Sequence, residues 1–346
     1  MLRLSRFEHH APRTLEEAVR LAAEPGRRAA FVSGGTDLYP AMKRGLAEPK
    51  TVVSLRQVPE LRGIRRNPEG GLTIGAMTTL QEVIQDRFVA TGYPALGQAA
   101  NFVASPQIRA MATVGGNLCS DTRCNYYDQS YLWRRAVDFC LKKDGDTCRV
   151  APGSTRCWAV SSSDLAPVAV ALGGRVRLAS VKGERTIPVQ DLYRDDGIAH
   201  LSKATDEILA DVVLPPPGGL LSTYLKLRRR GSTDFPVLGV AVAARIDPDG
   251  RCDLVRIVVG AVAPSPIEIA EAERILVGNR LTDELIEEAA GVVFDAVKPM
   301  DNTDLTPYYR KRVAHLYVTR ALTELWRQAR AASRPARAHR RAAGGN

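Results

Sequence analysis

Four cysteines in the middle of the chain, Cys124, Cys140, Cys148 and Cys157, are the residues best suited to carry chemistry. Fifteen, seven and eight residues lie between them. Thiolates are soft ligands, and four of them can surround a zinc ion or hold the corners of a cubane iron–sulfur cluster. Structural zinc sites commonly use Cys-x-x-Cys pairs, and the chain has none. The wide spacing favours an iron–sulfur cluster, with zinc and unligated cysteines as the alternatives.

The other two cysteines are interpreted differently. Cys119 follows a glycine pair by a few residues, and we interpret it as a packing residue rather than a fifth ligand or redox partner. Cys252 lies far along the chain and is interpreted as structural. The N-terminus has no apolar signal segment and no apolar run is long enough to span a bilayer, so we expect a cytoplasmic protein. Clustered cysteines in that compartment indicate a metal or redox site rather than disulfides.

Two glycine turns are the second chemical signal. Ser-Gly-Gly-Thr-Asp-Leu at 33–38 follows a short apolar run, and Thr-Val-Gly-Gly-Asn at 113–117 precedes the cysteines. Adjacent glycines permit positive φ, and their backbone N–H groups can converge on phosphate oxygens. Neither turn matches the dinucleotide-binding or P-loop pattern. A tight turn without a ligand is the alternative for each.

The elements that position these motifs follow from local patterns. Capping-box signatures at Thr14 and Thr79 predict helix starts. Apolar runs predict strands, and longer periodic segments predict helices. The predicted strands are 29–32, 51–55, 72–75, 175–178, 207–214, 223–229, 237–246 and 254–262, and the main predicted helices are 94–103, 166–172, 283–297 and 307 to about 330. The irregular alternation indicates an α+β fold without internal repeats.

The net charge of +10 could suggest a nucleic-acid partner, but its distribution argues otherwise. Six arginines lie in the last twenty residues without an acidic residue among them, and we expect 331–346 to be a disordered basic tail. A basic arm that contacts nucleic acid is the alternative. The five histidines show no triad or metal-ligand spacing, so no catalytic residue is assigned to this chain.

The ordered set of motifs resembles the flavoprotein subunits of the molybdenum hydroxylase (xanthine dehydrogenase) family. The likeness rests on the two glycine turns, on Ser-Asp-Leu-Ala-Pro at 163–167, on Tyr224-Leu-Lys226, and on the apolar strand after Asp234-Phe-Pro. It covers roughly residues 5–330. The chain departs from the family at Asp234-Phe-Pro, where Phe-Asp is more usual.

The resemblance implies a bound FAD. Backbone groups of the two turns would hold its pyrophosphate and ribityl chain, Asp164 would bond the adenosine part or the flavin tail, Lys226 would lie near the isoalloxazine, and Leu209 would pack on the ring. The residues expected in the turns are Ser33, Gly34, Gly35, Thr36, Asp37, Leu38, Thr113, Gly115, Gly116 and Asn117.

About forty residues between the second turn and Ser163 are absent from most of the family. This insertion resembles that of the β subunits of 4-hydroxybenzoyl-CoA reductases, which implies a [4Fe-4S] cluster on Cys124, Cys140, Cys148 and Cys157. The implied role is electron transfer in a heterotrimer, or in a dimer of that heterotrimer, with a large molybdopterin-binding subunit, a small [2Fe-2S] subunit and a ferredoxin-like external carrier. The substrate site would lie on the large subunit.

The expected fold is a PCMH-type FAD-binding domain of two subdomains at 1–216, with the insertion at about 119–160. An α/β-sandwich domain as in CO dehydrogenase flavoproteins follows at 217–330, after the Pro/Gly linker 215–219. One rival function is a hydroxylase that oxidises an aromatic heterocycle or aldehyde and uses the cluster as an electron exit. NAD reduction at the flavin is disfavoured if the insertion covers the ring. The distant rival is a zinc-stabilised nucleic-acid-binding module.

Overall fold

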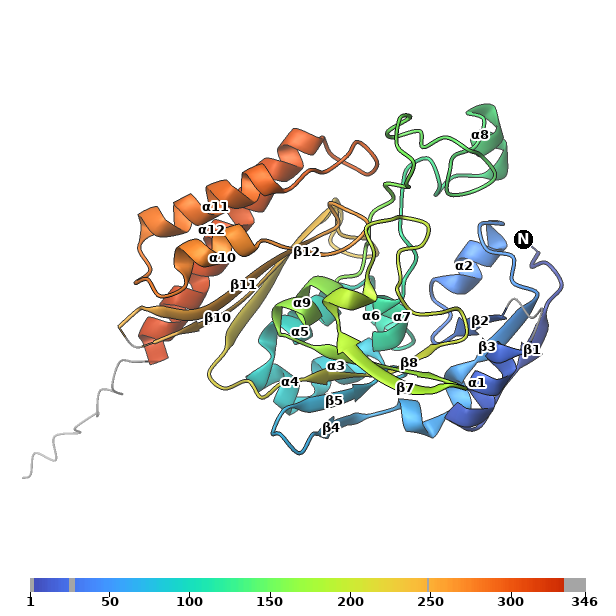
Figure 1. The fold of residues 1–346 in the computed structure, drawn as a ribbon, viewed down its shortest axis with the longest axis horizontal. Helices are drawn as coiled ribbons and strands as arrows, with labels where there is room; N and C mark the ends of the chain where they lie inside the picture. The colour runs from blue at the N-terminus through green and yellow to red at the C-terminus, as the bar shows by residue number, and fades with distance from the viewer. Residues whose placement is uncertain (1–2, 25–28, 248, 333–346) are drawn as a thin grey trace, which may run out of the picture.

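The structure is a computed structural model that describes residues 3–24, 29–247 and 249–332, and Figure 1 shows its arrangement. Three sheets occur in these residues, one parallel and two antiparallel. None of the helices in the described ranges has both the length and the apolar composition needed to cross a bilayer. The expected basic tail falls almost wholly outside the described residues.

The first subdomain is a small parallel sheet with two helices. Its strands lie in the order β1-β3-β2, with bounds β1 Glu8–His10, β2 Ala29–Val32 and β3 Thr51–Ser54. The helices are α1 Leu15–Ala23 and α2 Leu38–Lys43. As predicted, Thr14 caps α1: its Oγ1 accepts a hydrogen bond from the Glu17 amide at 3.1 Å. The first glycine turn connects the end of β2 to the start of α2.

The second subdomain is a five-stranded antiparallel sheet covered by short helices. Its strand order is β4-β5-β8-β6-β7, with bounds β4 Ile64–Arg66, β5 Leu72–Gly75, β6 Arg175–Ser180, β7 Gly183–Pro188 and β8 Ile208–Leu214. The helices are α3 Leu80–Gln85, α4 Arg87–Gly92, α5 Pro94–Phe102, α6 Pro106–Arg109, α7 Val114–Leu118 and α9 Leu165–Ala171, with 3-10 turns at Leu55–Gln57, Pro59–Leu61 and Gln190–Leu192. The predicted capping box at Thr79 is confirmed in both its bonds.

The C-terminal region is a four-stranded antiparallel sheet with helices on one face. Its strand order is β12-β11-β10-β9, with bounds β9 Leu221–Leu227, β10 Leu238–Ile246, β11 Cys252–Gly260 and β12 Ile267–Glu268. The helices are α10 Ala270–Leu276, α11 Asp283–Ala296 and α12 Pro307–Ala332. Figure 1 shows all three on the side away from α5 and α9.

Both faces of this sheet are buried, and β10 shows why its sequence is apolar without interruption. Val240, Val242 and Ala244 pack into the core shared with α10, α11 and α12. Ala241 and Ala243, on the opposite face, pack into the core of the second subdomain. Successive side chains of a strand point to opposite faces. The continuous apolar run therefore joins the two domains through one sheet.

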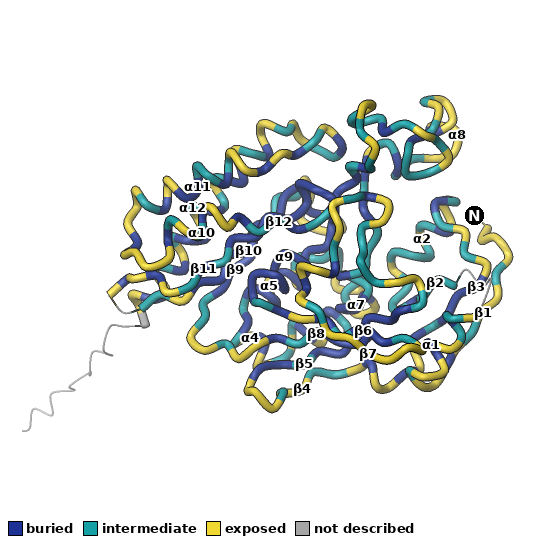
Figure 2. The backbone as a smooth tube through the Cα atoms, in the orientation of Figure 1, coloured by how far each residue is buried: buried dark blue, intermediate teal, exposed yellow. Residues whose placement is uncertain are grey.

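The segment at about 119–160, which the sequence analysis predicts to be an insertion, projects from the body as a lobe with little regular structure (Figures 1 and 2). Its helix in the described residues is α8, Tyr131–Ala136. The segments by which the chain enters and leaves the lobe are joined by reciprocal backbone hydrogen bonds of 2.8 Å between Arg123 and Val160. Asn302, from the C-terminal domain, accepts from the Asn125 amide and donates to the Trp158 carbonyl. The lobe is thus anchored to the body from the C-terminal side.

Candidate functional site

The two glycine turns lie against each other. A Cβ placed on Gly34 would stand 1.9 Å from the Met111 carbonyl oxygen, so the first turn packs backbone to backbone on the segment before the second. A Cβ on Gly116 would stand 3.8 Å from the Ser33 Cβ. Gly35 has a φ of +73°, which only glycine adopts without strain. The two motifs, far apart in the sequence, therefore form one site.

The first turn presents unpaired backbone donors. The amides of Gly34, Gly35 and Thr36 make no hydrogen bond to any other described residue. Asp37 occupies the N-cap position of α2, yet its side chain does not cap that helix. Free N–H groups at such a turn are the groups that bind phosphate oxygens. This turn fits the pyrophosphate of a dinucleotide.

The second turn is itself a short helix, α7, which the sequence analysis missed. Thr113 caps it by accepting from the Gly116 amide at 3.1 Å, and the Gly115 amide bonds to the Ala76 carbonyl at 2.8 Å. A Cβ on Gly115 would collide with Ala76 at 2.6 Å. The amides of this turn are used inside the protein, and an added Cβ on Gly116 would meet Thr113 Oγ1 at 3.1 Å, so the two glycines allow close packing around the turn.

The motif at 163–167 docks on the second turn through Asn117. The Asn117 Oδ1 atom accepts from Ser163 Oγ at 2.8 Å and from the Leu165 amide at 3.1 Å. Ser163 Oγ in turn accepts from the Ala166 amide at 3.0 Å, at the first turn of α9. These bonds explain why the two motifs occur together, since each satisfies polar groups of the other.

Asp164 and Lys226 form a buried ion pair. Lys226 Nζ is 2.9 Å from Asp164 Oδ2, and the Tyr224 hydroxyl donates to Asp164 Oδ1 at 2.9 Å. Lys226 also donates to the carbonyls of Phe102 at 3.0 Å and Asp234 at 2.9 Å. Burial raises the pKa of Asp164 and lowers the pKa of Lys226, and in each case the partner's charge opposes that shift. All three ammonium protons have acceptors inside the protein.

The expected flavin contacts of Asp164, Lys226 and Leu209 stay predictions. The ion pair joins α9 to the C-terminal sheet and is connected to the second turn through Ser163. Leu209 is the second residue of β8, near its start, and its side chain is buried in the core of the second subdomain. What the structure shows for all three is a buried side chain.

Replacing Lys226 by Met is expected to destabilise the fold, because the Asp164 carboxylate would stay buried without its cation. Removing one partner of a buried pair costs about 3–5 kcal/mol. Urea unfolding of Lys226→Met measures this loss. Arg230→Met removes an exposed ion pair to Asp234 and is the matched control, expected to cost under about 1 kcal/mol. Equal stability of the two variants would contradict a structural role for the buried pair.

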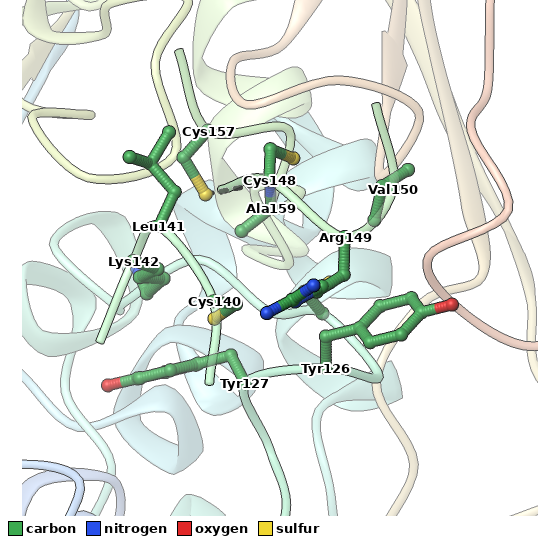
Figure 3. A pocket seen from close by; sticks show the side chains of 11 residues that line it. Tyr126, Tyr127, Cys140, Leu141, Lys142, Cys148, Arg149, Val150, Cys157 and Ala159 are labelled. Atoms are coloured by element: carbon green, nitrogen blue, oxygen red, sulfur yellow. Dashed lines mark hydrogen bonds between the residues drawn. The ribbon is translucent and has the colours of Figure 1, made fainter. Parts of the chain in front are cut away.

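The four cysteines predicted as ligands line one pocket. Figure 3 labels three of them, Cys140, Cys148 and Cys157. All four are buried, between 4% and 7% exposed. The pocket contains about 260 Å³ of atom-free space, including its mouth to solvent. The other lining residues are Tyr126, Tyr127, Leu141, Lys142, Arg149, Val150 and Ala159. Sequence reasoning thus identified four thiols that the fold brings together, although their role as ligands stays a prediction.

Cys124 and Cys140 reach the pocket from tightly bent segments of the lobe. The Cys124 carbonyl accepts from the amides of Tyr127 and Asp128 at 2.9 Å, closing a tight turn. Before Cys140, Asp138 and Phe139 both have positive φ, a backbone form that costs non-glycine residues of order 1–3 kcal/mol each. Arg149 holds this segment by donating to the Phe139 carbonyl at 2.8 Å. The lobe is therefore shaped by contacts that aim the thiols inward.

The Cys124 thiol has a raised pKa in this pocket, which the cationic side chains Lys142 and Arg149 also line. Burial raises the pKa of Cys124 to about 12, and the neighbouring thiols Cys157, Cys140 and Cys148 contribute to that rise. Metal binding to thiols supplies the positive charge that thiolates need and releases their protons. No group of three Cys, His, Asp or Glu side chains in the described part of the chain is placed to hold a single metal ion.

The two candidate ligands, a zinc ion and a cubane iron–sulfur cluster, require different spacings of the four sulfurs. With Zn–S bonds of about 2.3 Å, the sulfurs of a tetrahedral site stand about 3.8 Å apart. A cubane holds its cysteine sulfurs farther apart, outside the iron corners.

Cys119 ends α7 outside the pocket and packs against the main core, while Cys252 is buried in β11.

Sequence reasoning missed the part that α2 plays in this site. Leu46, just after α2, is buried in the same cluster as Cys124, Cys140 and Cys157, and Ala41 packs against it. Arg123 of the lobe donates to Asp37 of the first turn at 2.6 Å. No local pattern announces these contacts, because they join segments some 80 residues apart. The cysteine pocket and the first glycine turn are consequently neighbours that share α2.

The similarities to known proteins extend over most of the chain. A model described as the FAD binding domain in molybdopterin dehydrogenase matches residues 5–217, and the CO dehydrogenase flavoprotein C-terminal domain matches residues 222–325. The carbon monoxide dehydrogenase medium chain of Hydrogenophaga pseudoflava is 28% identical over 323 residues, covering 93% of this chain and 97% of the relative. The aldehyde oxidoreductase FAD-binding subunit PaoB of Escherichia coli (strain K12) is 33% identical, covering 77% and 85%.

Solved structures agree with the sequence matches. A carbon monoxide dehydrogenase structure from Hydrogenophaga pseudoflava superposes with a TM-score of 0.78 at 27% identity, over 94% of this chain and 99% of that chain. The expected fold, a PCMH-type FAD-binding domain followed by a CO dehydrogenase flavoprotein C-terminal domain, is confirmed. The chain belongs to the molybdenum hydroxylase family, as one of its FAD-binding flavoprotein subunits.

Proposed function

We propose that this protein is the electron-transfer subunit of a molybdenum-dependent oxidoreductase, with FAD at the two glycine turns and a [4Fe-4S] cluster on Cys124, Cys140, Cys148 and Cys157. The observation that carries the proposal is the convergence of four buried thiols on one pocket beside the first glycine turn. When bound, these two cofactors would pass electrons singly or in pairs. The chain's own residues position the cofactors and exclude water.

The flavin part rests on the unpaired donors of the first turn and on the close approach of the two turns at Gly116. The amides of Gly34, Gly35 and Thr36 would receive the pyrophosphate, and the remaining turn residues would shape its surroundings. The Asp164–Lys226 pair would hold α9 and the C-terminal sheet in register around the flavin. Its ammonium protons are already engaged, so it would act by position rather than by proton transfer.

The partner chains follow from the family. A large molybdopterin-binding subunit and a small [2Fe-2S] subunit would complete the enzyme, and a ferredoxin-like carrier would exchange electrons at the cysteine lobe. This chain presents no nucleophile–base pair in its described residues, and the substrate would bind on the large subunit. The lobe favours a reductive dehydroxylation like that of 4-hydroxybenzoyl-CoA reductases, in which electrons enter here.

The alternative is a hydroxylase in which electrons leave through the lobe. The names of the relatives favour it, since they include a nicotinate dehydrogenase FAD-subunit and a xanthine dehydrogenase FAD-binding subunit. Identifying the large chain that copurifies with this protein distinguishes the two directions. A zinc-stabilised nucleic-acid module is not proposed, because the chain belongs to the flavoprotein family.

Anaerobic purification followed by analysis of iron, sulfide, zinc and flavin tests the proposal. We expect about four irons, about four sulfides and one FAD per chain, the stoichiometry of one cubane and one flavin. A visible spectrum should show flavin bands on a broad iron–sulfur background. Flavin without iron would remove the cluster from the proposal, and zinc without flavin would overturn it entirely.

A further inference from the structure

Arg123 occupies an unusual place, at the point where three segments of the molecule meet. It stands directly before Cys124. Its guanidinium donates to Asp37 of the first glycine turn at 2.6 Å and to Asp128 of the lobe at 3.3 Å. It also lies 3.5 Å from the ring centroid of Phe235, in the C-terminal domain. One side chain therefore contacts the flavin-side turn, the cysteine lobe and the other domain.

The bond to Asp37 replaces an ordinary helix cap. An aspartate at the N-cap normally accepts from the amides of its own helix, but Asp37 makes no such bond and its carboxylate meets Arg123 instead. The position of this carboxylate, and with it the entry into α2, is set by the lobe. Asp37 closes the segment whose amides at Gly34 to Thr36 are unpaired.

Asp128 carries the connection on to a cysteine. Its Oδ2 atom accepts from the Cys124 amide at 3.3 Å, and its Oδ1 atom accepts from Arg123 at 3.3 Å and from Arg44 at 3.4 Å. Arg44 is the C-cap residue of α2. Both ends of α2 are thus held by the turn that begins at Cys124. A ligand that makes the Cys124–Asp128 turn rigid would therefore also hold α2 and the first glycine turn in place.

We propose that Arg123 couples the two cofactor sites, so that filling the cysteine pocket tightens nucleotide binding at the first glycine turn. The inference rests on the function proposed above. Ligation through Cys124 would immobilise the Cys124–Asp128 turn, and the Asp128–Arg123–Asp37 chain would then hold the first turn in its binding geometry. Preorganising a site removes part of the ordering cost of binding. By linkage, FAD would tighten cluster retention by the same factor.

Phe235 gives this arrangement its third support. The ring is 45% exposed and stacks on the Arg123 guanidinium, a contact that leaves the N–H groups free for the two carboxylates. This is the loop at which the sequence departs from the usual family pattern. Arg123, which belongs to the cysteine-containing segment, therefore contacts the loop that departs from the family pattern.

The test compares FAD affinity with and without a cluster. Protein stripped of both cofactors is divided, one half is reconstituted anaerobically with iron and sulfide, and FAD binding is followed by quenching of flavin fluorescence. We expect the iron-loaded wild type to bind FAD at least about fivefold more tightly, within the usual range of coupling between sites. Arg123→Met should bind FAD with one affinity in both states. Amide exchange at Gly34–Thr36 should slow on loading in the wild type only.

Two further variants keep the test decisive. Arg135→Met removes an exposed arginine of the same lobe that has no ion pair among the described residues, and it should behave like the wild type. Asp37→Asn breaks the bond between Asp37 and Arg123 from the other side and should also abolish the coupling. It provides the test if Arg123→Met folds poorly. Equal FAD affinities in loaded and iron-free wild type would overturn the coupling and leave the proposed function intact. Failure to bind iron or FAD at all would overturn both.

Discussion

Replacing Gly116 by Val is expected to abolish FAD binding while the protein stays folded. A Cβ at this position would stand 3.1 Å from Thr113 Oγ1, and Ser33 lies beyond it at 3.8 Å. The two methyl groups of valine would therefore fill the opening between the glycine turns. We expect at least about a 100-fold loss of affinity, which corresponds to about 2.7 kcal/mol. Titration of flavin-free protein with FAD measures it.

The contrast with two other glycines shows whether the loss comes from the site. Gly291 in α11 has no atom within 4 Å of an added Cβ, and Gly291→Val should bind FAD like the wild type. Gly34→Ala, by comparison, would collide with the Met111 backbone and should lose the fold together with the flavin. Retention of stoichiometric FAD by a folded Gly116→Val protein would refute the placement of the dinucleotide between the two turns.

The parts of the fold that could be predicted are those set by local chemistry. Thr79 and Glu82 form their reciprocal cap wherever the helix packs, so α3 was predictable from four residues. The apolar run of β10 was readable because both faces of that strand are buried. Gly250 and Asp247 close the turn between β10 and β11, with a 3.0 Å bond. These features depend on neighbours in the sequence.

The parts that were missed depend on distant partners. β1, with three residues, exists because it pairs with β3, and nothing within Glu8–His10 requires a strand. The helical form of the second glycine turn follows from the bond between Thr113 and Gly116, which glycine pairs do not suggest. In the site, residue types identified the four thiols, but the link from Arg123 to Asp37 spans 86 positions and carries no sequence signal.

Replacing Cys148 by Ser is expected to remove the iron–sulfur absorbance and leave one FAD per chain at saturating flavin. Cys148 is 4% exposed and faces the same pocket as Cys124, Cys140 and Cys157. A serine hydroxyl is a harder ligand that stays protonated at neutral pH, so it replaces a thiolate poorly. We expect iron to fall from about four per chain to below about one. Iron analysis and the visible spectrum measure this loss.

Cys119→Ser makes the same chemical change outside the pocket and should keep both iron and FAD, since Cys119 packs against the main core. The flavin result in Cys148→Ser separates two arrangements. If Arg123 couples two independently folded sites, FAD affinity falls several-fold but binding remains stoichiometric. If the lobe and the glycine turn fold only as one unit, flavin is lost together with iron. The contact that α2 and Leu46 make with the cysteine pocket is small compared with the hydrophobic core that supports the glycine turns. A small contact favours coupling between two separately folded sites over a single folding unit.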